Sequence, residues 1–193
     1  MARSARRYSR HSRKRSFPVD RAREHLEPGP IVLVTSAHRG ERNVMTLGWH
    51  MIMETEPSLW GCYIWTEDHT RSLVLKSREC VVNVPTVERV NTVVDIGNTS
   101  GEEIDKFETF GLTPRKASKV GAPLIDQCYA SFECRLHDSR LVRRYSLFVW
   151  EIVAAHVAPS PKSPRTIHYL GRGEFRVAGS RISRRGRFKP EMQ

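Results

Sequence analysis

The sequence predicts a mainly β protein, built as a small antiparallel barrel with a few short helices rather than as a doubly wound α/β sheet. Seven segments have the apolar, β-branched or aromatic character of strands. Only two or three stretches have helical spacing, and they do not alternate with the strands as βαβ units do. No G-x-G-x-x-G sequence follows a strand, which argues against a Rossmann nucleotide-binding domain.

The strands predicted for the first half follow a breaker cluster, P-G-P at 28–30. They are I-V-L-V-T-S-A (31–37), N-V-M-T-L-G-W-H-M (43–51), S-L-W-G-C-Y-I-W (58–65) and E-C-V-V-N-V (79–84). β-Branched and aromatic residues dominate all of these runs except the second. A turn at 38–41 joins the first two strands, and Pro85 ends the fourth.

Two short helices accompany these strands. T-R-S-L-V-L-K-S (70–77) begins at Thr70, whose hydroxyl suits an N-cap. T-V-E-R-V-N-T-V-V-D-I-G (86–97) places four valines at helical spacing and ends at Gly97, a common stop residue. The first half is therefore β-rich with two short helical segments.

The second half is predicted to be mostly β. A loop with Gly, Pro and Lys (111–123) leads to C-Y-A-S-F-E-C-R-L-H (128–137), in which apolar and polar residues alternate. A long strand follows from Tyr145 to Ala158, and a short last strand is expected at 175–179. Together with the first half, these strands favour the barrel class.

The formal net charge of +11 lies in the two ends of the chain. Residues 1–15 hold seven basic residues and no acid, and residues 181–193 hold five basic residues against one acid. Of the totals of 32 basic and 21 acidic residues, this leaves 20 of each for residues 16–180. We therefore predict a basic, disordered N-terminal arm (1–27), one domain (28–180) and a basic C-terminal tail (181–193).

The composition of the ends also bears on location and partners. The arm has no apolar segment typical of a secretory signal, although its Arg/Ser-rich character leaves a transit peptide open. A solvated extension is favoured over a salt-sensitive contact with nucleic acid, since neither end interleaves aromatic residues with its charges. No apolar run is long enough to span a membrane. Cys62 and Cys80 lie in apolar runs and no C-x-x-C pair occurs, which favours a reduced, cytoplasmic protein without structural zinc.

Residues 43–51 combine an amide, a hydroxyl, a glycine and an indole where core residues are expected. If this strand lies at the barrel rim, Thr46 and Gly48 leave the backbone accessible from one side. A flat ligand such as an isoalloxazine ring needs donors and acceptors along one edge and an apolar wall, which Trp49 can supply. The alternative, a bulged core strand, is about equally well supported by this stretch alone.

The segment T-E-D-H-T-R-S at 66–72 is a second candidate site. Thr70, Arg71 and Ser72 gather hydroxyls and a guanidinium where a helix begins, an arrangement that suits a phosphate. The alternative is a capping threonine with a solvated arginine, and in isolation it is favoured because most helix starts hold no phosphate.

Residues 98–107 form a third candidate, a loop that enters a short helix with Ser100 as its cap. Lys106 then stands about one turn into the helix and could face the electron-rich edge of a flavin. The alternative is a solvated lysine paired with Glu102. Further along, Tyr169 and Gly171 are typical of a turn that lines a pocket.

Taken in order, these motifs resemble the flavin reductase-like domain family, the FMN-binding split barrels. The motifs are N-V-M-T-L-G-W-H-M, E-D-H-T-R-S-L, E-C-V-V-N-V-P, S-G-E-E-I-D-K-F-E-T-F-G-L-T, A-P-L-I-D-Q-C-Y-A-S-F-E-C and T-I-H-Y-L-G-R-G-E-F. They cover about residues 28–180 and neither end. The resemblance implies a six-stranded antiparallel split barrel of Greek-key type, usually a homodimer with FMN near the subunit interface.

The resemblance also implies roles for individual residues. Those expected around the flavin ring are Asn43, Thr46, Leu47 and Trp49, and those expected near the ribityl chain and phosphate are Thr66, Thr70, Arg71 and Ser72. Ser100 and Lys106 would approach the ring from the next loop, with Lys106 as the catalytic residue that favours reduced, anionic flavin. Tyr145 falls where relatives often carry a histidine, and Phe175 would close the pocket.

The function that follows is an FMN-dependent oxidoreductase that uses NADH or NADPH and can pass reduced flavin to a monooxygenase or another acceptor. The cofactor carries the chemistry, so no catalytic dyad is needed. One alternative is an FMN-binding electron carrier without activity on free flavin. A polyanion or nucleic-acid binder that acts through the basic ends ranks last.

Overall fold

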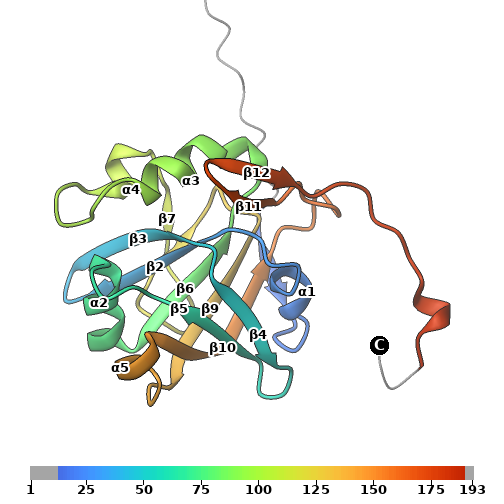
Figure 1. Ribbon diagram of the computed structural model, residues 1–193, viewed down its shortest axis with the longest axis horizontal. Coiled ribbons are helices and arrows are strands. Elements are labelled where there is room, and N and C mark those ends of the chain that lie inside the picture. The colour runs from blue at the N-terminus through green and yellow to red at the C-terminus, as the bar shows by residue number, and fades with distance from the viewer. Residues whose placement is uncertain (1–12, 190–193) are drawn as a thin grey trace, which may run out of the picture.

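One antiparallel sheet of eight strands dominates the computed structural model, which describes residues 13–189. Its hydrogen-bonded order is β3-β2-β6-β9-β10-β5-β4, with β1 beside β10. The strands are β1 (Arg15–Phe17), β2 (Val32–His38), β3 (Glu41–Leu47), β4 (His50–Glu54), β5 (Leu59–Tyr63), β6 (Glu79–Val84), β9 (Ala130–Asp138) and β10 (Leu147–Val157). They curl around a central core (Figure 1), so the predicted barrel class is confirmed.

Short helices and two small sheets surround the barrel. The helices are α1 (Arg23–Leu26), α2 (His69–Ser77), α3 (Val90–Gly97), α4 (Lys106–Thr109) and α5 (Val142–Tyr145), with 3-10 turns η1 (Val87–Arg89) and η2 (Arg185–Arg187). The small sheets pair β7 (Pro114–Arg115) with β8 (Leu124–Ile125), and β11 (Ile167–Gly171) with β12 (Glu174–Val177). The helices predicted at 70–77 and 86–97 are confirmed by α2 and by η1 with α3. Within the described part of the chain, no helix has the length and apolar character needed to cross a lipid bilayer.

The barrel is interrupted between β3 and β4, at a break that we call the seam. These two strands are the ends of the strand order, yet only Gly48 and Trp49 separate them in sequence. The Tyr63 backbone N–H donates to the Trp49 carbonyl at 3.0 Å, which ties the seam to the end of β5. The single strand predicted at 43–51 is therefore two strands, and this division, with the added β1, gives eight strands where the resemblance implies six.

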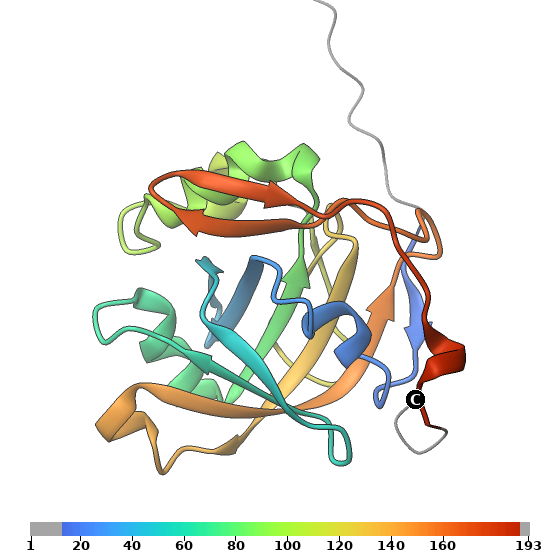
Figure 2. The same ribbon diagram turned by 45° about the vertical axis from the view of Figure 1, so that its right-hand side comes forward.

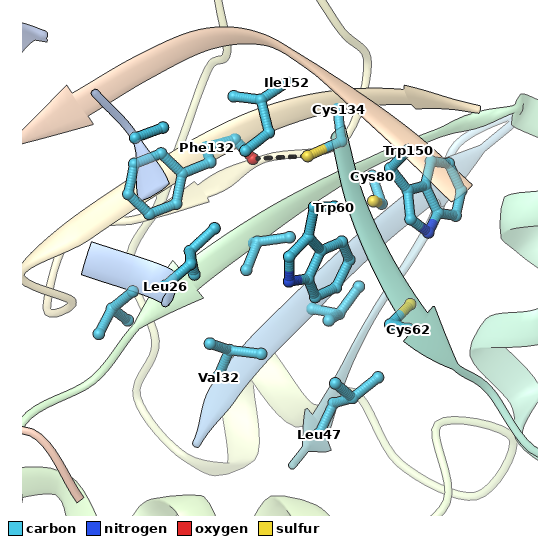
Figure 3. Packing of buried hydrophobic residues seen from close by; sticks show 14 of the residues in the cluster. Leu26, Val32, Leu47, Trp60, Cys62, Cys80, Phe132, Cys134, Trp150 and Ile152 are labelled. Atoms are coloured by element: carbon cyan, nitrogen blue, oxygen red, sulfur yellow. Dashed lines mark hydrogen bonds between the residues drawn. The ribbon is translucent and has the colours of Figure 1, made fainter. Parts of the chain in front are cut away.

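The main core fills the inside of the barrel with aromatic, aliphatic and cysteine side chains (Figure 3). Its largest fully buried members are Trp60, Phe132, Phe148 and Trp150. All four cysteines of the chain are buried and unpaired, and burial raises the pKa of Cys62 and Cys80. They behave as small apolar residues, as predicted, because a buried thiol that keeps its proton is unreactive.

His50 ties the first residue of β4 to this core. The Trp60 indole N–H donates to His50 Nδ1 at 3.1 Å, which leaves the proton on Nε2 to be donated to the Pro30 carbonyl at 2.7 Å. Burial lowers the pKa of His50, partly offset by the bond to Pro30. The neutral ring therefore fixes the direction in which β4 leaves the seam.

A second apolar cluster lies on the opposite face of β2 and β3, under α3, α4 and the β11–β12 hairpin. Figure 2 shows this hairpin lying along α3 above the barrel. Ile31 and Leu33 belong to the outer cluster, whereas Val32 and Val34 belong to the barrel core. The I-V-L-V run is continuously apolar because both faces of β2 are buried.

Residues 13–27 do not form the disordered arm that their composition predicts. β1 pairs with the end of β10, and the Lys14 ammonium donates to the Ile125 carbonyl at 2.5 Å and to Ser131 Oγ at 2.7 Å. Burial lowers the pKa of Lys14 to about 8, against the opposing effects of Cys128 and Asp126. Residues 181–189 of the predicted tail are exposed and include η2, and the rest of the predicted arm and tail, at 1–12 and 190–193, lies outside the described residues.

Two expectations for the second half are also wrong in detail. Ala130 to Cys134 are buried in succession rather than alternately, because the barrel core covers one face of β9 and the 116–121 loop contacts the other. Tyr145 ends α5, and the long strand begins two residues later. The last predicted strand is β12, and its partner β11 was missed.

Candidate functional site

The seam opens into a cleft of about 630 Å³ that five separate segments line. We call it the seam cleft. Its lining residues are Gly29, Ile31, Met45, Thr46, Leu47, Gly48 and Trp49 around the seam, Tyr63, Trp65 and Asp68 after β5, Val93, Val94, Gly97 and Asn98 on α3, and Tyr169, Gly173 and Phe175 on the β11–β12 hairpin. A cavity of this size falls in the range of small-molecule sites, about 300–1,000 Å³.

Aromatic side chains stand exposed at the mouth of the seam cleft. Trp49 is 74% exposed, Trp65 is 55% exposed and Tyr169 is 53% exposed. Trp49 packs against Tyr63 with ring centroids 5.4 Å apart, and Tyr169 packs against Phe175 at 5.2 Å. Large rings left open to solvent around a concavity suit the binding of a flat, conjugated ligand.

Two glycines bring backbone to the surface of the same cleft. Gly48 and Gly97 are both exposed, at the seam and at the end of α3. The end of α3 is held close to β3 because Thr46 Oγ1 donates to the Val93 carbonyl at 2.6 Å. A Cβ at Gly97 would stand 3.5 Å from the Thr46 side chain. Peptide groups beside these glycines are thus reachable by a ligand edge.

The cleft is lined by four of the residues that the sequence analysis expected near a flavin: Thr46, Leu47, Trp49 and Phe175. The hydroxyl of Thr46 is already engaged with α3, so its contribution to the surface is mainly apolar. Leu47 is buried at the floor, and Phe175 reaches the cleft from the β11–β12 hairpin. For residues 43–51, a ligand site and a bulged core strand explained the sequence about equally well. In the structure, part of this stretch lines a surface cleft.

The start of α2 differs from its prediction. Asp68 occupies the N-cap position, and its carboxylate accepts from the Trp65 backbone N–H at 2.9 Å. Thr70 lies inside the helix, is fully buried, and accepts a hydrogen bond from the Asn43 amide at 2.9 Å. Thr70 is therefore not the cap, and its hydroxyl links α2 to β3.

Arg71 is neither solvated nor directed into the seam cleft. Its guanidinium donates to the Ile64 carbonyl at 2.9 Å, to Ser146 Oγ at 3.1 Å and to the Val142 carbonyl at 3.2 Å. It also lies over the Phe148 ring, 5.4 Å from the centroid. In this conformation Arg71 anchors α5 against α2.

The two other residues expected near a phosphate are exposed and do not line the seam cleft. Thr66 lies in the turn before α2, and Ser72 Oγ donates to the His69 carbonyl at 3.1 Å. Tyr145 is 54% exposed at the end of α5, with Arg144 over its ring. The structure does not bring these residues together with Trp49 and Phe175, and their roles toward a ligand stay predictions.

The 98–107 loop also differs from its prediction. Asp105 caps α4 by accepting from the backbone N–H groups of Phe107 at 2.8 Å and Glu108 at 3.3 Å. Ser100 instead accepts from the Glu102 N–H at 3.2 Å, within a turn that precedes the helix. The prediction of Ser100 as the helix cap is therefore wrong.

Lys106 is buried, so the alternative of a solvated lysine paired with Glu102 is wrong. Its ammonium donates to the Ile96 carbonyl at 3.0 Å, directly beneath the end of α3 that lines the seam cleft. Burial lowers the pKa of Lys106, and the nearby Asp68 opposes this shift. Burial raises the pKa of Asp68, against the Trp65 N–H and the charges of Lys106 and Arg71.

Several lining residues were missed by sequence reasoning. Trp65 and Val94 lie outside the candidate motifs, and Asn98 begins the 98–107 motif but was passed over for Ser100 and Lys106. Asp68 was inside the 66–72 motif but was passed over for its hydroxyl and guanidinium neighbours. Tyr169 had a usable signal, since its turn had been singled out as typical of a pocket.

The match to a family model decides the relationship. The model described as "Flavin reductase like domain" matches residues 25–177, which includes every strand of the barrel except β1. The chain belongs to the flavin reductase-like domain family. The predicted resemblance is confirmed, and the matched residues are 25–177 where the sequence motifs cover about 28–180.

Solved structures agree with this fold. An FMN-binding domain of a flavin reductases-like enzyme from Shewanella baltica has a TM-score of 0.84 at 22% identity, covering 90% of this chain and 98% of that one. Flavoredoxin of Desulfovibrio vulgaris has a TM-score of 0.74 at 20% identity, covering 96% and 97%. Nitrilotriacetate monooxygenase component B from Bacillus cereus has a TM-score of 0.69 at 18% identity, covering 82% and 88%.

Proposed function

We propose that this flavin reductase-like protein binds FMN in the seam cleft and acts as an NAD(P)H-dependent oxidoreductase. The observation that carries the proposal is the cleft itself. It combines exposed rings at Trp49, Trp65 and Tyr169 with accessible backbone at Gly48 and Gly97. Membership of the family, whose solved relatives include an FMN-binding domain, supports the choice of ligand.

The lining fits a flavin by shape and by polarity. FMN, when bound, supplies hydride and electron transfer. Leu47 gives an apolar floor and Trp49 a flat wall, and the peptide groups beside the two glycines can meet the polar edge of a ring. Lys106 contributes its positive charge from behind α3, which favours an anionic ligand in the cleft.

The test is a visible absorption spectrum of the purified protein with added FMN, before and after NADH or NADPH. Binding should perturb the flavin spectrum, and reductant should bleach it. Continued NAD(P)H oxidation in the presence of excess FMN supports a reductase. If the bound flavin is reduced only once and NAD(P)H oxidation then stops, the result supports the second candidate, an electron carrier. The exposed aromatic residues at the mouth of the seam cleft favour the electron carrier, because a flavin ring bound there would stay accessible to another redox protein. A monooxygenase would be one such acceptor.

Filling the seam cleft should block flavin binding without unfolding the protein. Val94 is 38% exposed on α3 and lines the cleft, so Val94→Trp places an indole where the ring should lie. We expect the FMN dissociation constant, measured by flavin fluorescence, to rise at least about tenfold, which corresponds to roughly 1.4 kcal/mol. The matched control is Leu75→Trp on α2, at a residue that is 41% exposed and does not line the cleft. Equal affinity in both variants would place the flavin elsewhere.

We also propose that the chain is a homodimer, through the exposed apolar strip that begins at the seam. Trp49 at the seam is 74% exposed, and Met51 and Met53 on β4, an end strand of the sheet, are 51% and 42% exposed. Such a strip is unusual on a monomer surface. Sedimentation velocity should show a dimer for the wild type and for Leu75→Glu, and a monomer for Met51→Glu. A monomeric wild type would contradict the proposal.

Four buried, unpaired cysteines support a reducing compartment such as the cytoplasm.

A further inference from the structure

His69, the first residue of α2, lies between two carboxylates from different segments. Its Nε2 is 2.6 Å from Glu41 Oε1 at the start of β3, and its Nδ1 is 3.2 Å from Glu102 Oε1 in the loop before α4. The imidazole side chain is only 13% exposed, whereas Glu41 and Glu102 are 53% and 71% exposed. One side chain therefore connects α2, β3 and the 98–106 loop.

Both contacts can be hydrogen bonds only when the ring carries two protons. A neutral imidazole has one N–H and one lone pair, so one carboxylate would then face a lone pair. The imidazolium donates to both carboxylates and gains from both charges. Protonation of His69 therefore favours the closed arrangement of these three segments.

The 98–106 loop reaches the seam cleft at both of its ends. Asn98 lines the cleft, and Lys106 lies behind α3 with its ammonium on the Ile96 carbonyl. Between them, Gly101 packs so closely on the Asn43 amide that a Cβ at residue 101 would collide with it. Release of the middle of this loop would shift residues at the cleft edge.

The geometry points to His69 as a positioning residue that, when protonated, clamps the 98–106 loop and so strengthens flavin binding in the seam cleft. This inference rests on the proposed function, since it takes flavin as the ligand of the cleft. It gives the site a pH dependence in a definite direction, with tighter binding toward acidic pH.

The other charged groups around His69 have partners or lie farther along the same segments. From β3, Arg42 pairs with Asp105 of the loop at 3.1 Å and lies over the Phe107 ring. From α2, Asp68 accepts from the Trp65 N–H. The Arg42–Asp105 pair fastens the far end of the loop independently of His69, so the change with pH is assigned to His69 and its two glutamates.

The experiment follows the dissociation constant of riboflavin by fluorescence from pH 5.5 to 8.5. Riboflavin replaces FMN because a phosphate monoester itself titrates near about pH 6. For the wild type we expect the constant to rise about three- to fivefold with pH, the size expected for a partly exposed ion pair. In Glu102→Gln the amide can donate to the Nδ1 lone pair, so both contacts survive without the second proton. That variant should keep the acidic-pH affinity throughout.

The matched control is Glu103→Gln, which removes the same charge one residue away at an exposed side chain and should keep the wild-type profile. A second readout needs no ligand. The Gly101 amide shift in ¹H–¹⁵N NMR should follow pH in the wild type and in Glu103→Gln, and much less in Glu102→Gln. A flat wild-type profile, or equal profiles for the two variants, would overturn the inference while leaving flavin binding intact. If no flavin binds, the proposed function fails, and the NMR titration alone decides whether the clamp exists.

Discussion

Trp60→Ala should lower the free energy of unfolding by about 3–5 kcal/mol, the range for removing a large aromatic side chain from a packed core. Trp60 is fully buried in the barrel core, so the truncation leaves a large cavity. It also removes the indole N–H that His50 Nδ1 accepts at 3.1 Å. Loss of that bond adds to the cavity cost because His50 is itself partly buried.

Urea unfolding followed by circular dichroism measures this effect without relying on tryptophan fluorescence. Trp60→Phe keeps an aromatic ring but loses the N–H and the five-membered part of the indole, so its cost should be smaller, about 1–3 kcal/mol. Trp65→Ala is the matched control, since Trp65 is 55% exposed and its loss should cost below about 1 kcal/mol. Similar losses for Trp60→Ala and Trp65→Ala would contradict the placement of Trp60 in the core.

Glu133→Leu should destabilise the protein by about 1.5–3 kcal/mol, because it removes the charged acceptor that several part-buried hydrogen bonds share. The Glu133 carboxylate is fully buried. It accepts from the Ser118 N–H and hydroxyl, both at 2.8 Å, from the Lys119 N–H at 2.5 Å and from His156 Nε2 at 2.7 Å. Leucine fills the volume but leaves these groups without an acceptor.

The same carboxylate should make stability fall in acid. Burial tends to raise the pKa of Glu133, but the donors from Ser118, His156 and Lys119 outweigh burial and lower the pKa below 4.5. A lowered pKa in the folded state means that this contribution is present above about pH 4.5 and is lost as the pH falls through the folded-state value. Urea titrations at pH 7 and pH 3.5 should therefore show a smaller acid loss in Glu133→Gln than in the wild type. The exposed Glu103→Gln should lose as much as the wild type, and equal losses in all three proteins would rule out the role of Glu133.

Local sequence patterns identified most strands, because the pattern of apolar residues reflects which faces of a strand are buried. The run at 31–37 is continuously apolar because both faces of β2 are covered, and 79–84 has the same character for the same reason. Composition gave the wrong prediction for Lys14, which looks like one more solvated basic residue in a disordered arm. Its ammonium finds the Ile125 carbonyl and Ser131 Oγ more than a hundred residues away, and no local rule encodes that contact.

The candidate site was predictable only where its residues are close in sequence. Thr46 and Trp49 stood out because small, polar and aromatic residues interrupt an apolar strand. Trp65 and Asn98 join them only through the convergence of separate segments, which depends on the closed barrel. Arg71 shows the opposite failure. The local rule for anion sites does not hold there because the guanidinium binds the Val142 carbonyl of α5, 71 residues further along the chain.

The docking of β1 on β10 has a practical consequence for anyone who shortens this protein. A chain cut at residue 28, where composition places the domain start, would lose Lys14 and would bare the backbone of Ala155 to Val157. Newly bared strand backbone readily recruits other chains and promotes aggregation. Truncation should therefore stop before residue 13, and low yields from shorter versions would reflect a missing strand rather than an unstable fold.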